Sequence, residues 1–248
     1  MKKILVLVVL MSIFSVMILG GIIDEIKARG YLIVGTEATF PPFEYYNENN
    51  EIVGFDIDIA KKIADALGVK LKIVDTAFDG LIPSLLTKKL DVVIAGMTIT
   101  KERAKVVSFS DPYFIAGQVI VIKKGNPPIK DLNGLKGKVV AVQLGTTGDL
   151  VVSDLKGLKE IRRFTKFTDA FLELKNGRVD AVVLDSAVAK AYVLSNPDLE
   201  ITSDVLSSEQ YGIAVRKEDK DLLQFVNKVL EDMRKSPYDL LIEKWFSK

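Results

Sequence analysis

The sequence predicts an α/β protein of two lobes, each built on a mostly parallel sheet flanked by helices and joined by two crossing strands. Short apolar runs alternate with stretches of helical periodicity, which is typical of βαβ units and parallel sheets. The alternation occurs in two successive series, and no Gly/Ser/Pro-rich linker separates them. The 248 residues suffice for two units of about 110 residues, each able to bury a core.

The first series starts with a buried strand at 32–34 and a β-hairpin whose polar tip lies at 47–50. Apolar residues at helical spacing then predict a helix over 56–67, which ends at Gly68. The series continues with a strand at 71–74, a helix at 81–87 and a strand at 92–95.

The second series repeats this rhythm and is followed by a return to the first lobe. Residues 114–118 and 207–211 are the natural crossing segments, since a hinge needs only a few residues to absorb a rotation. We therefore assign residues 22–115 and 210–248 to lobe 1 and residues 116–209 to lobe 2. The predicted strands are 119–122, 139–142, 161–164, 181–184 and 212–215, and the predicted helices are 149–155, 167–176, 186–194, 222–233 and 240–246.

The first 21 residues are typical of a secretory signal peptide. Lys2 and Lys3 precede an apolar run over 4–19, and Gly20 and Gly21 follow it. The run is short for a spanning helix of about 20 residues. An uncleaved membrane anchor is the alternative, because the cleavage region lacks the usual pair of small residues. We expect export to the periplasm or the cell exterior.

The composition excludes several classes of function. The chain has no Cys and no His, and its formal charge of +1 falls to −1 if Lys2 and Lys3 are removed. A zinc site is therefore not expected, and a near-neutral chain without a basic stripe is a poor partner for nucleic acid. Phosphate-binding signatures are also absent, so we expect no metal, no cofactor and no nucleic acid. Sparse glutamine and dense charge favour a thermophilic source.

Ligands of open α/β sheets gather beyond the carboxyl ends of the strands, and four such ends here carry polar residues. Beyond the strand at 92–95, Gly96 permits close approach to the backbone. Thr98 offers a hydroxyl and an N–H, and Arg103 can hold a carboxylate bidentately. The alternative for Arg103 is an ordinary surface arginine at a helix start.

Two further strand ends lie in the second lobe. Thr146 and Thr147 stand between two glycines at a helix start, which predicts a small anion-binding nest. Asp185 follows the strand at 181–184 and is placed to accept hydrogen bonds from an ammonium group. A helix cap is the alternative for these polar residues.

The fourth strand end is a loop in which Glu37 stands three residues before Phe40. A cation over an aromatic face gains about 0.5–2 kcal/mol, and a buried cation needs an acidic partner. The loop therefore predicts a site for a cationic group, to which Gln143 can add a hydrogen bond. Core packing is the alternative for Phe40, and a solvated loop position is the alternative for Glu37.

In order and spacing, these segments resemble the polar amino acid-binding proteins of ABC importers, most closely the arginine-binding and lysine/arginine/ornithine-binding members. The resemblance covers about residues 26–246 and implies the type II periplasmic binding protein fold. It also implies a free basic L-amino acid as ligand and the membrane permease of an ABC importer as partner. The matching segments are GTEATFPPFE at 35–44, VGFDIDIA at 53–60, FDGLIPSL at 78–85, DVVIAGMTITKER at 91–103, FSDPY at 109–113 and GTT at 145–147.

The resemblance implies how the common part of an amino acid is held. An arginine matching Arg103 binds the α-carboxylate, with help from backbone and hydroxyl groups matching Thr98 and Thr147. An acid matching Asp185 binds the α-ammonium, together with the carbonyl of a residue matching Ala95 and a group matching Thr98.

The resemblance also implies the side-chain pocket, where the chain departs from the family pattern. Aromatics matching Phe40 and Phe78 flank the ligand side chain, and an acid matching Glu37 meets its basic head. Lysine/arginine/ornithine binders usually have tyrosine and aspartate in place of Phe40 and Glu37, and serine is common where this chain has Gly96. The predicted ligand-binding residues are Glu37, Phe40, Phe78, Ala95, Gly96, Met97, Thr98, Arg103, Gln143, Thr146, Thr147 and Asp185.

We therefore predict an extracytoplasmic solute-binding protein, not an enzyme, that captures a basic L-amino acid by lobe closure. Arginine is favoured over lysine, ornithine and histidine, and glutamine is an alternative. A cyclohexadienyl dehydratase-like enzyme is the rival class, with Asp79, Glu37 or Asp149 as general acid. A receptor's sensing domain would need a membrane span or signalling domain after Lys248. The sequence leaves open whether the last helix exchanges between chains in a dimer.

Overall fold

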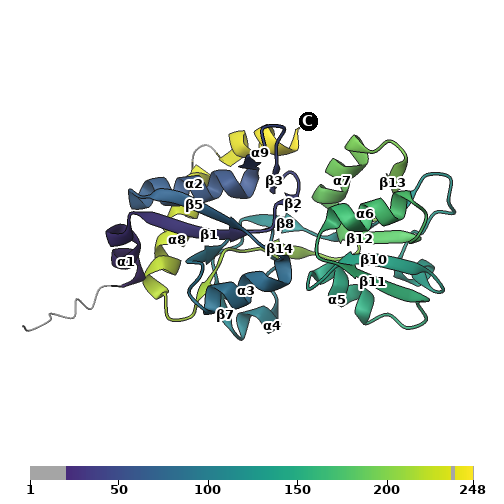
Figure 1. The fold of residues 1–248 in the computed structure, drawn as a ribbon, viewed down its shortest axis with the longest axis horizontal. Helices are drawn as coiled ribbons and strands as arrows, with labels where there is room; N and C mark the ends of the chain where they lie inside the picture. The colour runs from purple at the N-terminus through teal and green to yellow at the C-terminus, as the bar shows by residue number, and fades with distance from the viewer. Residues whose placement is uncertain (1–20, 236–237, 248) are drawn as a thin grey trace, which may run out of the picture.

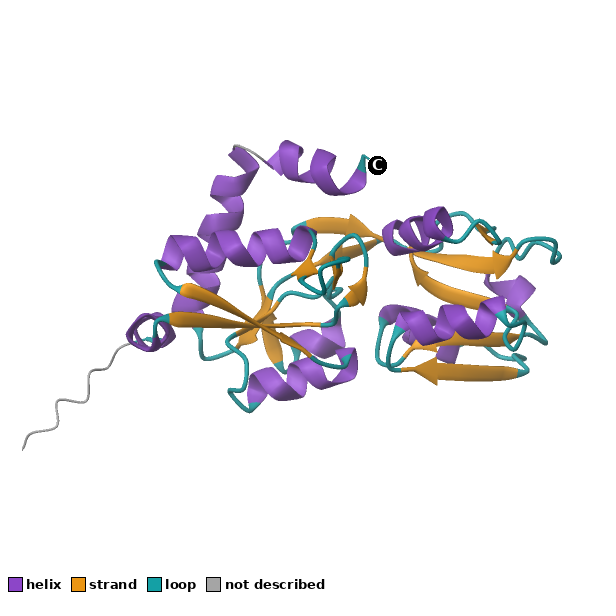
Figure 2. Cartoon of the chain, turned by 45° about the horizontal axis from the view of Figure 1, so that its top comes forward, coloured by secondary structure: helices purple, strands orange, loops and turns teal. Residues whose placement is uncertain are grey.

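A computed structural model describes residues 21–235 and 238–247, so the predicted signal peptide lies outside the described residues except for Gly21. The described chain forms two lobes side by side with a two-stranded ribbon between them (Figure 1). Strands lie at the centre of each lobe and helices surround them (Figure 2). In the part of the chain that is described, no helix is long and apolar enough to cross a membrane.

Lobe 1 is the part of the fold built on the first five-stranded sheet. In sheet order its strands are β5 (Lys70–Asp75), β1 (Tyr31–Thr36), β6 (Val92–Val93), β15 (Ala214–Arg216) and β7 (Val107–Phe109). β1 is parallel to β5 and β6, whereas β15 is antiparallel to both of its neighbours. The reversed strand β15 is the one that enters the sheet after the second crossing segment.

Lobe 2 repeats this plan on a second five-stranded sheet. Its strands are, in order, β11 (Glu160–Phe164), β10 (Val139–Gln143), β12 (Ala181–Asp185), β9 (Gln118–Lys123) and β13 (Leu199–Ile201). Here the reversed strand is β9, which enters from the first crossing segment. The sheets are therefore mixed: four strands of each run one way, and the strand that enters from the hinge runs the other way.

The lobes are joined by β8 (Phe114–Ala116) and β14 (Glu209–Tyr211), which pair in antiparallel register. These are the two crossing strands expected from the sequence, whereas the residue boundaries of the lobes stay a prediction. The helices are α1 (Ile22–Arg29), α2 (Phe55–Leu67), α3 (Phe78–Leu86), α4 (Lys101–Ala104), α5 (Thr147–Ser153), α6 (Phe167–Lys175), α7 (Ser186–Ser195), α8 (Lys220–Lys235) and α9 (Tyr238–Phe246), with a 3-10 turn at Leu132–Leu135.

The predicted hairpin is present as part of a three-stranded sheet of β2 (Thr39–Phe40), β3 (Glu44–Tyr46) and β4 (Ile52–Val53). Several elements differ from the sequence prediction. Helix α3 begins at Phe78 rather than Leu81, because its first turn lacks a capping side chain that would mark the start. The elements α1, β7 and β13 were not predicted; the two strands have three residues each, too few to show an alternating pattern.

The lobes are closed upon each other. The Tyr192 hydroxyl on α7 donates to the carbonyl of Thr39 in lobe 1 at 3.0 Å. Phe40 of lobe 1 stacks on Phe167 of lobe 2, with ring centroids 5.7 Å apart. Apolar and polar groups thus meet across the cleft, and the cavity that remains between the sheets is lined by residues of both lobes.

Candidate ligand-binding site

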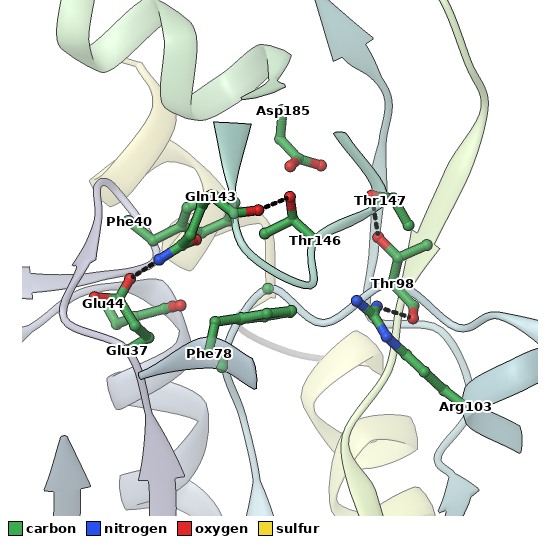
Figure 3. Close-up of a pocket in the computed structure, with 12 residues that line it drawn as sticks. Glu37, Phe40, Glu44, Phe78, Thr98, Arg103, Gln143, Thr146, Thr147 and Asp185 are labelled. Atoms are coloured by element: carbon green, nitrogen blue, oxygen red, sulfur yellow. Dashed lines mark hydrogen bonds between the residues drawn. The ribbon is translucent and has the colours of Figure 1, made fainter. Parts of the chain in front are cut away.

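A small cavity lies between the two closed lobes. Eleven of the twelve predicted residues line it, and Glu44 lines it as well. Carboxyl groups lie at one end and a guanidinium at the other (Figure 3). The lining residues are Glu37, Phe40, Glu44, Phe78, Ala95, Gly96, Thr98, Arg103, Gln143, Thr146, Thr147 and Asp185.

Arg103 supplies the guanidinium and is fixed by its own helix start. The Thr100 hydroxyl accepts from the backbone N–H of Arg103 at 3.2 Å, which begins α4 and aims the side chain at the cleft. The guanidinium donates to the carbonyl of Thr98 at 2.7 Å and, across the cleft, to the carbonyl of Gly145 at 2.9 Å. It lies over the Phe78 ring, 5.2 Å from the centroid. Burial lowers the pKa of Arg103.

Two threonines lie near this end, one from each lobe. The Oγ1 atoms of Thr98 and Thr147 are 3.5 Å apart. Thr146 caps α5, since its hydroxyl accepts from the N–H of Asp149 at 3.2 Å and donates to the carbonyl of Gln143 at 2.8 Å. The helix-cap alternative thus describes the Thr146 side chain, whereas the Thr147 hydroxyl remains at the cavity wall.

Asp185 ends β12 and is buried against the cavity with 4% of its surface exposed. Within the described residues its side chain makes no capping hydrogen bond to α7, and its Oδ1 has no partner. Burial, followed by the charge of Glu209, raises the pKa of Asp185 to about 7. A buried carboxyl with one oxygen left without a donor is suited to an incoming cation.

The far end of the cavity combines an acid, an amide and an aromatic ring. Glu37 is buried, with 2% exposed, and burial raises the pKa of its carboxyl. Its Oε2 accepts from the Gln143 amide of lobe 2 at 2.9 Å, the contact drawn in Figure 3, and from the Thr39 hydroxyl at 2.8 Å. Gln143 thus reaches across the cleft, and the side chains of Glu37, Thr39 and Gln143 form one hydrogen-bond network.

Gly96 is required beside Phe40. Its backbone has φ +50°, and an added Cβ would lie 2.5 Å from Cε1 of the Phe40 ring. Its N–H donates to Oδ2 of Asp56 at 2.7 Å. A serine at this position would overlap the ring, so the presence of Phe40 requires glycine at position 96.

Met97 is the predicted residue that does not line the cavity. Its side chain is 1% exposed and belongs to the core cluster formed by α3 and lobe 1 strands. Its carbonyl accepts from the N–H of Gly212 at 3.0 Å. The alternation of side chains along an extended segment turns Met97 inward when Thr98 turns to the cleft.

Two acids near the cavity were not identified from the sequence as site residues. Glu44 is fully buried, and neither of its carboxyl oxygens has a partner among the described residues. Burial and the neighbouring Asp56 raise the pKa of Glu44 well above its usual range, and burial raises that of Asp56 to about 6. Both lie in motifs quoted above, but an acid in a β-hairpin and one at a helix start usually face solvent.

Glu209, on the crossing strand β14, is the third unpredicted acid. It is buried, with 9% exposed, and hydrogen-bonds with Thr98 and Thr147. No local motif marks it, because its role depends on the pairing of β14 with β8. Across the described ranges, no group of three potential metal ligands is found.

The chain was compared with known proteins. The family model of bacterial extracellular solute-binding proteins, family 3, matches residues 32–248. A structure of holo ArgBP from T. maritima has 69% identity, covers 90% of this chain and 99% of its own, and has a TM-score of 0.85. ABC transporter arginine-binding protein 1 of Escherichia coli is 39% identical and covers 86% of this chain and 89% of its own. An L-cystine-binding protein of Escherichia coli is 37% identical, covering 91% and 86%.

The packing of Phe40 against Gly96 gives a prediction. Gly96→Ala should lower the free energy of unfolding by about 1–2 kcal/mol for the left-handed backbone and by about 1–3 kcal/mol more for overlap with the ring. Gly68→Ala is the matched control, because Gly68 has φ +73° and no described atom lies within 4 Å of an added Cβ. In urea unfolding, Gly68→Ala should lower the free energy of unfolding only by the backbone contribution of about 1–2 kcal/mol. Equal costs for both variants would contradict the packing argument.

Proposed function

The chain belongs to the bacterial extracellular solute-binding proteins of family 3, and from this premise we propose that it captures L-arginine outside the cytoplasm and delivers it to the membrane permease of an ABC importer. Lysine, ornithine and histidine follow arginine in the proposed order. The arginine-binding relatives support this ligand, and the relatives compared above are named as binding proteins rather than enzymes.

The order of charges along the cavity carries the proposal. Arg103 lies at one end, Asp185 is buried on the wall between, and Glu37 lies at the other end. A free amino acid with a basic side chain presents the complementary series, namely a carboxylate, an ammonium and a second cation. Each buried charge of the protein then gains an opposite charge on the ligand.

Lobe closure is the proposed mechanism of capture. The lining comes from both lobes, since Arg103 and Glu37 belong to lobe 1 and Gln143 and Asp185 to lobe 2. A ligand that contacts both lobes binds the closed form better than the open form and shifts the population toward it. The closed form is the state that we propose the permease recognises.

The choice of arginine over glutamine rests on the end of the cavity where Glu37 lies, opposite Arg103. Glu37 gives a carboxyl that suits a cation, and Gln143 gives an amide oxygen that can accept from a planar guanidinium. Phe40 supplies an aromatic face for the same group. The L-cystine-binding relative shares the family, so ligand choice is expected to lie in this end of the cavity rather than in the fold.

A thermal-shift screen of the twenty amino acids and ornithine tests the proposal. Arginine at about 100 times its dissociation constant should stabilise the protein by about 2.7 kcal/mol, and glutamine should stabilise it less. Glu37→Gln should weaken arginine far more than glutamine, because it removes the charge but keeps the shape. Glu48→Gln, at the exposed tip of the β3–β4 hairpin, is the control. An unchanged ratio of the two affinities in Glu37→Gln would contradict the proposed charge recognition.

Arg103→Ala should abolish amino acid binding. The ligand carboxylate would then be buried without a partner, and removing one member of a buried pair costs about 3–5 kcal/mol, which is more than a hundredfold in affinity. Isothermal titration calorimetry measures it, and a circular dichroism spectrum equal to that of the unchanged protein shows that the fold is intact. Near-native arginine affinity in this variant would overturn the site.

Affinity should depend on pH through Asp185, whose pKa burial raises to about 7. An ammonium ligand favours the ionised carboxylate, so below that pH binding must first remove a proton. Arginine affinity should therefore fall as the pH falls, by up to about tenfold per unit. Calorimetry between about pH 5 and about pH 8 measures this, with Asp185→Asn as the control that should lose most of the dependence. A flat profile in the unchanged protein would refute the assignment.

A further inference from the structure

Glu209 holds three hydroxyl groups at the junction of the lobes. Its Oε2 accepts from the hydroxyl of Thr98 in lobe 1 at 2.8 Å and from that of Thr147 in lobe 2 at 2.6 Å. Its Oε1 accepts from the Ser207 hydroxyl at 2.7 Å. Ser207 is itself fixed, because its oxygen accepts from the backbone N–H of Gln118 at 2.9 Å.

These contacts determine which hydrogen bonds the hydroxyls of Thr98 and Thr147 donate and which they accept. A carboxylate can only accept hydrogen bonds, so each threonine hydroxyl must donate its single hydrogen to Glu209. The Thr147 oxygen also accepts from the side-chain amide of Gln118 at 3.1 Å. Thr98 and Thr147 line the cavity, and the hydrogen-bonding capacity left on their hydroxyls is that of lone pairs. Both hydroxyls therefore act as acceptors toward a ligand.

We propose that Glu209 is a positioning residue that selects for the α-ammonium of the ligand by locking the hydroxyls of Thr98 and Thr147 as acceptors. The inference rests on the proposed function and deepens it. An ammonium has three hydrogens to donate, and Asp185 and the two threonine oxygens are three acceptors among the residues that line the cavity. The ligand carboxylate is left to Arg103 and backbone N–H groups, not to the threonine hydroxyls.

Selectivity for the amino group separates this role from a merely structural one. L-Arginine and its des-amino analogue, 5-guanidinopentanoic acid, differ only at the α-ammonium. The affinity of each is measured by calorimetry, with the analogue in competition against arginine, for the unchanged protein, Glu209→Gln and Glu209→Asp. The ratio of the two affinities is the readout.

Glu209→Gln should lower arginine affinity by about ten- to a hundredfold, the equivalent of one hydrogen bond to a charged group. Its amide can donate, so a hydroxyl is freed to turn its hydrogen to the cavity. The analogue should lose much less, so the ratio falls. Glu209→Asp keeps an acceptor-only group and should keep the ratio even if both affinities drop. Glu48→Gln, an exposed acid, should change neither affinity.

Equal loss of both ligands in Glu209→Gln, or no loss of either, would overturn the inference while leaving the proposed function intact. Failure of the unchanged protein to bind arginine would instead refute the proposed function. If Glu209→Gln does not fold, Thr147→Ser and Thr147→Val carry the test. Serine keeps a hydroxyl that donates to Glu209 and should keep the ratio, whereas valine removes it and should lower the ratio; equal ratios would overturn the inference.

Discussion

Burial of opposite charges inside a closed cleft is the constraint on which the rest of the site depends. Arg103, Asp185 and Glu37 come from different parts of the chain. Burial raises the pKa of the two carboxyls and lowers that of the guanidinium, so it favours the neutral form of each group. An ionised group taken out of water is costly unless it is paired. The closed arrangement is therefore favoured most when a ligand of complementary charges fills it. Ligand capture and lobe closure become one equilibrium.

The fold satisfies this constraint by bringing strand ends from two sheets to one place. Each sheet presents the carboxyl ends of its parallel strands to the cleft, and the two crossing strands, β8 and β14, join the sheets there. β14 does more than connect the lobes, because Glu209 on it contacts hydroxyls of both. The hinge thus forms part of the wall that surrounds the ligand.

Much of this was predictable from the sequence, and the exceptions have physical causes. Periodicity suffices to predict the longer strands and helices, and the rule that ligands gather beyond strand ends points to polar residues such as Arg103 and Asp185. Met97 is predicted to line the site, but the alternation of an extended segment turns it inward into the core. The sequence does not reveal Glu209, since only the tertiary pairing of β14 with β8 brings it beside its neighbours.

The balance of charge in the cavity is the physical basis for proposing a basic ligand. Three carboxyl groups line it, from Glu37, Glu44 and Asp185, against the guanidinium of Arg103, and Glu209 lies behind the same wall. A neutral zwitterion such as glutamine satisfies Arg103 and Asp185 but brings no charge for the far end. That end must then stay protonated or unpaired, as the raised pKa values of Glu37 and Glu44 indicate. A guanidinium provides a cation where these acids lie, so the proposed selectivity for arginine rests on the surplus of acids rather than on shape alone.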